Sequence, residues 1–263
     1  MRVGDVAVEI GDDFVALVEI RRPPNNFFDR ALIASLAQAC EALDAEPGCR
    51  AIVLASEGKH FCAGADFGAP DADLADESGA HLYERSTHLY DEAVRLFATR
   101  TPVVAAIQGA AIGGGLGLAL WPDFRVAAPE ARFSANFARL GFHHGFGLSV
   151  TLPRLVGSQA AQELLYTGRR IDGEQARDLG LCDRLVPLER VRSEARALAA
   201  EIAGSAPLAV ASIRETLRGD LAEQIRDATR RERVEQERLQ KTEDFREGVA
   251  AMAARRAPVF RGR

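Results

Sequence analysis

Two runs of consecutive apolar residues, 51–55 and 103–107, each lead directly into a segment rich in glycine and other small residues. A short unbroken apolar run between turn signals is typical of a strand whose two faces are both buried. The glycine-rich segment that follows the second run, residues 109–117, opens into a short apolar stretch that we expect to be helical. Buried strands that alternate with turns and helices predict an α/β fold with stacked sheets and argue against a simple helical bundle.

The segments around these two runs extend the same pattern. Apolar residues alternate over 6–10 and again over 15–19, with Gly11-Asp12-Asp13 between them, which predicts an N-terminal hairpin. The prolines in residues 22–26 require a loop, and Asp29 is a candidate N-cap for a helix with a regular apolar stripe. We expect a further helix over 82–97 and short strands at 124–127 and 132–134.

From about Ser205 onward the strand signal disappears. Apolar residues recur every four positions at Ile213, Leu217, Leu221 and Ile225, as in an amphipathic helix with one apolar stripe. Such a stripe can pack on its own chain or form a subunit interface, and periodicity does not separate the two. We therefore predict a core over residues 1–204 and a C-terminal helical region over residues 205–263.

Composition limits the classes of partner. The formal net charge is −5 and the isoelectric point is about 5.7, which argues against a nucleic-acid-binding protein. No apolar stretch is long and uninterrupted enough to span a bilayer, and no apolar signal-peptide core follows the N-terminus. Four cysteines stand at positions without C-x-x-C spacing, which favours reduced thiols over a disulfide or zinc framework. We expect a cytoplasmic protein with no metal and no membrane or nucleic-acid partner.

The two glycine-rich segments, residues 57–66 and 108–117, are the candidates for chemistry. Glycine allows close backbone approach, and the start of a helix offers N–H groups that have no partner within the helix. Two such groups that converge on one point would bind an oxyanion. Tight packing of helix on strand is the alternative reading. A dinucleotide site is not expected, because Leu118 stands where G-x-G-x-x-G requires glycine and no suitable acidic residue follows.

In their order and spacing, segments along nearly the whole chain resemble the crotonase family, also called the enoyl-CoA hydratase/isomerase family. These segments are residues 22–26 (RPPNN), 61–66 (FCAGAD), 113–115 (GGG), 155–157 (LVG), 165–168 (LYTG), 176–181 (ARDLGL), 244–248 (DFREG) and 255–260 (RRAPVF). The resemblance implies a crotonase-like spiral of ββα units with C-terminal helices that build trimers or hexamers.

The resemblance also implies an acyl-CoA thioester as ligand, with no cofactor besides the coenzyme A that the substrate carries. The thioester enolate would be stabilised by the backbone N–H groups of Ala65 and Gly114. The residues expected to contact the acyl-CoA are Pro24, Asn25, Ala63, Asp66, Phe67, Phe137 and Arg255, the last as a partner for a coenzyme A phosphate.

The chain departs from the hydratases of this family at two positions. Those enzymes carry one glutamate two residues after the third glycine and another four residues after a phenylalanine, where this chain has Gly117 and Phe137. A general acid or base contributes roughly 10²–10⁴-fold to a rate. His144, and less so His143, is a candidate replacement because histidine titrates near neutral pH. Isomerisation, decarboxylation or C–C cleavage is as reasonable as hydration, and the alternative is a binding protein that holds acyl-CoA without turnover.

Overall fold

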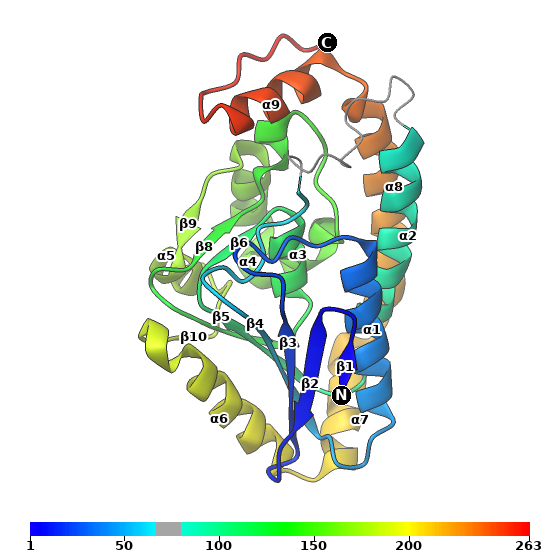
Figure 1. Cartoon of the computed structure of the whole chain (residues 1–263), viewed down its shortest axis with the longest axis vertical. Helices are drawn as coiled ribbons and strands as arrows, with labels where there is room; N and C mark the ends of the chain where they lie inside the picture. Colours follow the sequence, from blue (N-terminus) through cyan, green and yellow to red (C-terminus); the bar gives the residue numbers. More distant parts are fainter. Residues whose placement is uncertain (67–79) are drawn as a thin grey trace.

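A computed structural model describes residues 1–66 and 80–263, and for residues 80–88 it describes the backbone. A seven-stranded sheet runs through the lower half of Figure 1, and a three-stranded sheet lies above it. The strands of the large sheet, in spatial order, are β1 (Arg2–Val3), β2 (Val6–Ile10), β3 (Val15–Ile20), β4 (Ala51–Ser56), β5 (Val103–Ile107), β7 (Phe124–Ala127) and β10 (Arg184–Leu185). The small sheet has the order β6 (Ala110–Ile112), β8 (Arg132–Ser134) and β9 (Ile171–Asp172). The predicted α/β class with stacked sheets is confirmed.

The large sheet is parallel from β3 to β10, and β1 and β2 join it as an antiparallel edge. The predicted hairpin is the β2–β3 pair, with Val8 opposite Val18. In the small sheet β6 and β8 are parallel, whereas β9 is antiparallel to β8.

The helices that surround the sheets are α1 (Arg30–Asp44), α2 (Ala80–Phe97), α3 (Gly114–Leu120), α4 (Leu148–Thr167), α5 (Gly173–Asp178), α6 (Val191–Ala203), α7 (Pro207–Arg218), α8 (Leu221–Gln240) and α9 (Glu243–Ala253). Two short 3₁₀ helices, η1 (Asn136–Leu140) and η2 (Leu188–Arg190), complete the set. Helix α1 begins where the sequence predicts, because the Asp29 carboxylate accepts a hydrogen bond of 2.8 Å from the Leu32 amide.

Both faces of the large sheet are covered, which explains its unbroken apolar runs. On β4, Ile52 and Leu54 belong to the larger core, which includes the apolar stripe of α1. Val53, between them, faces the other way into a smaller core formed with α6. Side chains alternate across a strand, so a strand that is buried on both faces needs an apolar residue at every position.

The C-terminal region contains helices α7 to α9 and no strand in residues 205–263, all of which are described. Helix α8 packs along α2, as Figure 1 shows in orange and teal, and its Leu221 and Ile225 are buried within the chain. The α7 part of the stripe differs, because Ile213 and Leu217 are 59% and 73% exposed. The division of the chain into residues 1–204 and 205–263 stays a prediction.

In the described parts of the chain, no single helix has the length and apolar character needed to cross a membrane. One pair of helical segments, 188–203 and 207–240, meets these criteria only when taken together, and the pair is bent by 106°.

Candidate active site

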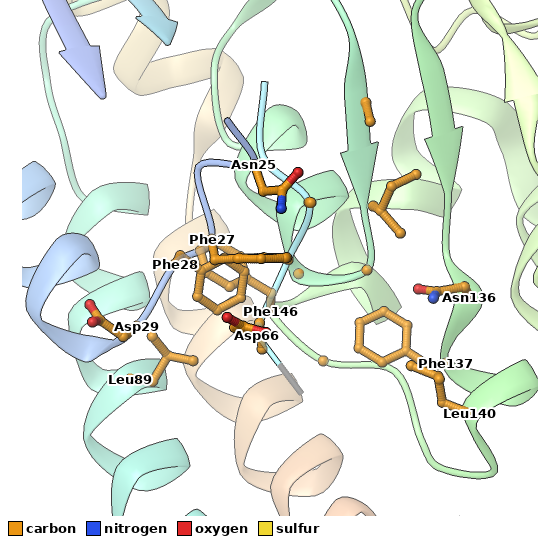
Figure 2. A pocket seen from close by; sticks show the side chains of 18 of the residues that line it. Asn25, Phe27, Phe28, Asp29, Asp66, Leu89, Asn136, Phe137, Leu140 and Phe146 are labelled. Atoms are coloured by element: carbon orange, nitrogen blue, oxygen red, sulfur yellow. The ribbon is translucent and has the colours of Figure 1, made fainter. Parts of the chain in front are cut away.

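A cavity of about 1530 Å³ lies between the loop before α1, the glycine-rich turn before α3, η1 and the last two helices. The residues that line this cavity are far apart in the sequence, from Arg22 to Met252. Figure 2 shows labelled side chains from the loop before α1 and from η1, together with Asp66 and Phe146, around the same space. The cavity contains both glycine-rich segments singled out by the sequence, and so it is the candidate site.

The loop over residues 61–66 is fixed against the small sheet by backbone hydrogen bonds. The Cys62 amide donates to the Ala110 carbonyl at 2.9 Å, and the Ile112 amide donates to the Cys62 carbonyl at 3.0 Å. This pairing brings Gly64 against the turn before α3. A Cβ at Gly64 would lie 2.7 Å from the carbonyl oxygen of Ile112 and 3.8 Å from the Gly114 amide nitrogen. Only glycine fits this approach, since Gly64 also has a φ of +87°.

Ala65 and Gly114 both line the cavity. Gly114 is the first residue of α3, where helical amides have no partner within the helix. Within residues 1–66 and 80–263, no hydrogen-bond acceptor is recorded for either amide. Two amides at one cavity can stabilise negative charge on a carbonyl oxygen, provided that both point at it.

The space beside Gly117 is occupied by a neighbouring aromatic residue. A Cβ at Gly117 would lie 2.6 Å from Cβ and 2.8 Å from Cδ1 of Phe146. Phe146 is only 1% exposed, and its ring lies 5.6 Å from the ring of Phe28, centroid to centroid. The space that a side chain at position 117 would need is therefore occupied. Phe137 also lines the cavity, with its ring 5.4 Å from that of Phe142.

His144 lies beside α4 and is not among the described residues that line the cavity. Its Nε2 is 2.8 Å from the Ser149 hydroxyl, and its ring stacks on that of His143 at 4.1 Å. Burial, together with the neighbouring His143, lowers the pKa of His144 to about 4. A role as acid or base stays a prediction, and the position of the ring gives it no support. His143 is likewise absent from the described lining.

Five of the residues expected to contact substrate do line the cavity: Pro24, Asn25, Ala63, Asp66 and Phe137. Phe67 lies outside the described residues. Arg255 is exposed and is not among the described lining residues. Four other cations line the cavity instead, namely Arg22, Arg30, Arg132 and Arg170. The sequence did not single them out, because arginine is frequent along the whole chain.

Two carboxylates are found among the described residues that line the cavity. Asp29 accepts the hydrogen bond that caps α1 and pairs with Arg22 at 2.9 Å, so it has a structural task. Asp66 follows Ala65 directly, and its residue is exposed to the cavity. Asp66 is thus a cavity carboxylate that is adjacent in sequence to the Ala65 amide.

Asn26 holds the loop before α1 in place, a role that sequence reasoning missed. It is fully buried with a φ of +49°, and its side-chain amide donates to the carbonyls of Glu57 and His60 at 2.8 and 2.7 Å. Asparagine tolerates this left-handed conformation better than most residues. The loop that carries Pro24 and Asn25 is thereby joined to the loop that leads to Ala65.

A buried polar network behind the cavity was also missed. The Glu232 side chain, which is completely buried, accepts hydrogen bonds from the Gly147 amide, the Ser149 amide and the Ser149 hydroxyl. Next to it, the Tyr90 hydroxyl donates to Gln236 at 2.6 Å. The Gln236 side-chain amide in turn donates to the His143 carbonyl at 3.0 Å, so the segment is fixed on both sides of Phe146. These contacts come from helices whose sequences carry no local signal, because the partners are distant in the chain.

Cys62 has no sign of nucleophilic character. It is fully buried, and burial raises the pKa of its thiol to about 12. A thiol in that state is not the reactive thiolate. Among the described residues, no group of three or more His, Cys, Asp or Glu side chains could hold a metal ion.

The arrangement of the parallel sheet and the small second sheet is that of the crotonase class. The family model described as enoyl-CoA hydratase/isomerase matches residues 11–263. A curated relative from Thermus thermophilus is 36% identical over 255 residues, which cover 96% of this chain and 100% of the relative. The probable enoyl-CoA hydratase of Bacillus subtilis is 34% identical and covers 95% of this chain and 96% of its own length.

Solved structures agree with the sequence comparisons. The crystal structure of an enoyl-CoA hydratase/isomerase from Pseudoalteromonas atlantica superimposes with a TM-score of 0.85 at 30% identity, covering 98% of this chain and 100% of that one. The chain belongs to the enoyl-CoA hydratase/isomerase family.

Proposed function

We propose that the protein binds an acyl-CoA thioester and stabilises its enolate with the amides of Ala65 and Gly114. The observation that carries this proposal is the pairing of the 61–66 loop with β6, which brings Gly64 so close to the turn before α3 that a Cβ there would lie 2.7 Å from the Ile112 carbonyl oxygen and 3.8 Å from the Gly114 amide nitrogen. Both donor residues line one cavity, and the α-proton of a thioester becomes easier to remove when charge on the oxygen is stabilised. Coenzyme A enters as part of the substrate, so no separate cofactor is proposed.

The reaction that we favour starts with proton or carbon removal at the α-carbon and does not use water. Hydration needs a positioned base for water and an acid for the α-carbon. Position 117 is a glycine against Phe146, and position 137 is a phenylalanine. Isomerisation can use one carboxylate both to remove a proton and to return it at another carbon, whereas decarboxylation or C–C cleavage needs a single proton delivered to the α-carbon after the carbon group has left. We assign this proton transfer to Asp66, a carboxylate among the described residues that line the cavity.

A ligand without the carbonyl oxygen tests the two amides directly. We expect butyryl-CoA to bind roughly tenfold more tightly than the thioether butyl-CoA, since two net hydrogen bonds contribute about 1–3 kcal/mol together. Calorimetry measures both affinities, with free coenzyme A as reference. Equal affinity for butyryl-CoA and butyl-CoA would show that the carbonyl oxygen is not bound.

A matched pair of variants assigns the effect to one amide. Ala65→Pro removes the N–H, whereas Ala65→Gly alters the side chain and keeps the N–H. The preference for the thioester should fall in Ala65→Pro and persist in Ala65→Gly, with circular dichroism confirming that both variants are folded. Loss of the preference in both variants would contradict the assignment.

A binding protein without turnover is the second candidate, and the absence of the two glutamates favours it. Exchange of the butyryl-CoA α-protons in deuterium oxide separates the two functions. An enzyme that forms the enolate will catalyse exchange, and Asp66→Asn will slow it while binding persists. Binding without any exchange would leave the second candidate standing.

We also propose self-association into a trimer or hexamer through α7. Leu208, Ile213 and Leu217 on this helix are 86%, 59% and 73% exposed, whereas Arg214 on the same helix is buried. Exposed apolar side chains that gather on one element mark an interaction surface. Sedimentation at micromolar concentration measures the state, and a monomer would refute the proposal. A cytoplasmic location, and a coenzyme A phosphate contact by Arg255, remain parts of this proposal.

A further inference from the structure

The cavity collects an unusual share of the aromatic residues of the chain. The whole chain has 13 Phe, 3 Tyr and 1 Trp. The aromatic side chains that line the cavity are Phe27, Phe28, Tyr90, Phe137, Phe142 and Phe146. Six of the 32 described residues that line the cavity are aromatic, which is about three times the 6% share of aromatic residues in the whole chain.

The rings lie on two sides of the start of α3. On one side Phe28 contacts the Cα of Gly114 so closely that no Cβ fits there, and Phe146 excludes a Cβ at Gly117 in the same way. On the other side a Cβ at Gly113 would meet Cζ of Phe137 at 3.8 Å. Figure 2 shows Phe28 and Phe146 together and Phe137 apart from them, across the open part of the view. The peptide bond that carries the Gly114 amide therefore joins Gly113, beside Phe137, to Gly114, beside Phe28.

The aromatic wall around Phe146 is held rigidly. Phe146 has a left-handed backbone with a φ of +61°, which a phenylalanine adopts only when its surroundings impose it. Glu232 fixes the next residue, Gly147, through its amide at 2.9 Å. Gly145, on the other side, is packed against Tyr90 and Gln236 without room for a Cβ. The ring is therefore placed before any ligand arrives, which lowers the entropic cost of binding.

We infer that the acyl group of the substrate ends in a planar aromatic ring, which binds between Phe137 and the Phe28–Phe146 pair. This inference rests on the proposed function, because it is the thioester oxygen at Gly114 that directs the acyl carbons between the rings. Aromatic rings prefer offset or edge-to-face arrangements at centroid distances of roughly 4.5–7 Å. The Phe28–Phe146 and Phe137–Phe142 pairs already have this geometry, at 5.6 and 5.4 Å.

Two ligands of similar size and apolar character test the shape of the acyl group. 3-Phenylpropanoyl-CoA carries a flat ring, whereas 3-cyclohexylpropanoyl-CoA carries a puckered one, and neither has a double bond that could be hydrated. We expect calorimetry to give three- to tenfold tighter binding for the phenyl ligand. Equal affinities, or a preference for the cyclohexyl ligand, would overturn the inference.

Substitution of either of two phenylalanines that both contact Phe142 tests whether the preference for the phenyl ligand arises at the cavity. Phe142 has Phe137 on one side at 5.4 Å and Phe245 on the other at 5.2 Å, and Phe245 is not among the described lining residues. Phe137→Leu should reduce the preference to less than twofold, whereas Phe245→Leu should retain it. Retention in Phe137→Leu would contradict the inference. If Phe137→Leu does not fold, the comparison of the two ligands on the wild type still decides.

The same titrations separate this inference from the proposed function. If butyryl-CoA binds more tightly than butyl-CoA but the phenyl and cyclohexyl ligands bind equally, the amides act as proposed and the aromatic acyl group is wrong. If no acyl-CoA binds more tightly than free coenzyme A, the proposed function itself fails.

Discussion

Gly117 is a position where adding one methyl group should change the free energy of unfolding in a predictable direction. In an ordinary helix interior, replacing glycine by alanine stabilises by about 1 kcal/mol. In α3 the added methyl group would lie 2.6 Å from Cβ of Phe146, an atom next to the backbone that cannot rotate away. Overpacking of this kind costs about 1–3 kcal/mol. We therefore expect Gly117→Ala to be less stable than the wild type by about 1 kcal/mol, in spite of the higher helix propensity of alanine.

Gly204 provides the matched control. It ends α6 with a φ of −72°, and a Cβ there would approach no atom more closely than 3.5 Å. Gly204→Ala should stabilise the protein by about 0.4–1 kcal/mol through the unfolded state. Urea unfolding followed by circular dichroism gives both free energies, provided that the transitions are reversible.

The decisive result is that Gly117→Ala lowers the free energy of unfolding whereas Gly204→Ala raises it. If Gly117→Ala is stabilised as much as Gly204→Ala, Phe146 does not occupy the space beside α3. A double variant adds a second check, because Phe146→Ala should relieve the clash and make Gly117→Ala favourable in that background. The same contact implies that Gly117→Glu with Phe137→Glu will destabilise the fold rather than restore hydration, since it buries carboxylates without room or partners.

Three further predictions concern the reaction, the histidine pair and the anchoring of α7. Crotonyl-CoA hydration by the purified protein should have a kcat/KM well below about 10⁶ M⁻¹s⁻¹, and a value above this in a steady-state assay would mean that another residue does the acid/base work. The pKa of His144 is lowered from 6.5 to about 4, so its contribution to stability is present above pH 6.5 and is lost as the pH falls toward 4. His144→Gln should therefore lose less stability than the wild type between pH 7 and pH 4, by up to roughly 3 kcal/mol in urea unfolding, and identical losses would refute the assignment. Asp123→Asn leaves Arg214 and Arg218, at 2.9 and 3.1 Å, without their charge partner; it should cost about 3–5 kcal/mol by the same measurement, and a loss below 1 kcal/mol would show that the pairs contribute little.

Local patterns predicted most of the architecture. The continuous apolar runs at β4 and β5 follow from burial on both faces, and the α1 cap at Asp29 follows from a side chain and its near neighbours. The family resemblance located the loop at Ala65 and the turn at Gly114, because glycine is required wherever two backbones approach closely. The strand and cap signals lie within a few residues of the features that they predict, whereas the resemblance depends on the order of segments along nearly the whole chain.

The remaining parts of the site depend on contacts that no local pattern encodes. The sequence shows that Gly117 lacks a carboxylate, but it cannot show that Phe146 fills the space, because the two residues meet through the packing of α3 against the loop before α4. Glu232 is one of many charged residues on α8 and is the one that turns inward. The apolar stripe was also ambiguous for this reason, since its α8 half packs on the chain and its α7 half does not.

The cavity is lined by residues from the beginning, the middle and the end of the chain, and this determines when during folding it can form. Its walls need Asn25 from the first loop, Gly114 from the middle of the chain and Met252 from α9. Contacts between such distant residues form only after large loops have closed, which is slow for non-local topologies. The two amides come together once β6 pairs with the 61–66 loop. The aromatic side chains around them are fixed only after α8 has docked against α2. A chain in which β6 has paired with the 61–66 loop but α8 has not yet docked would thus have the two donors without the enclosing aromatic side chains, and ligand affinity would report whether the last helices are in place.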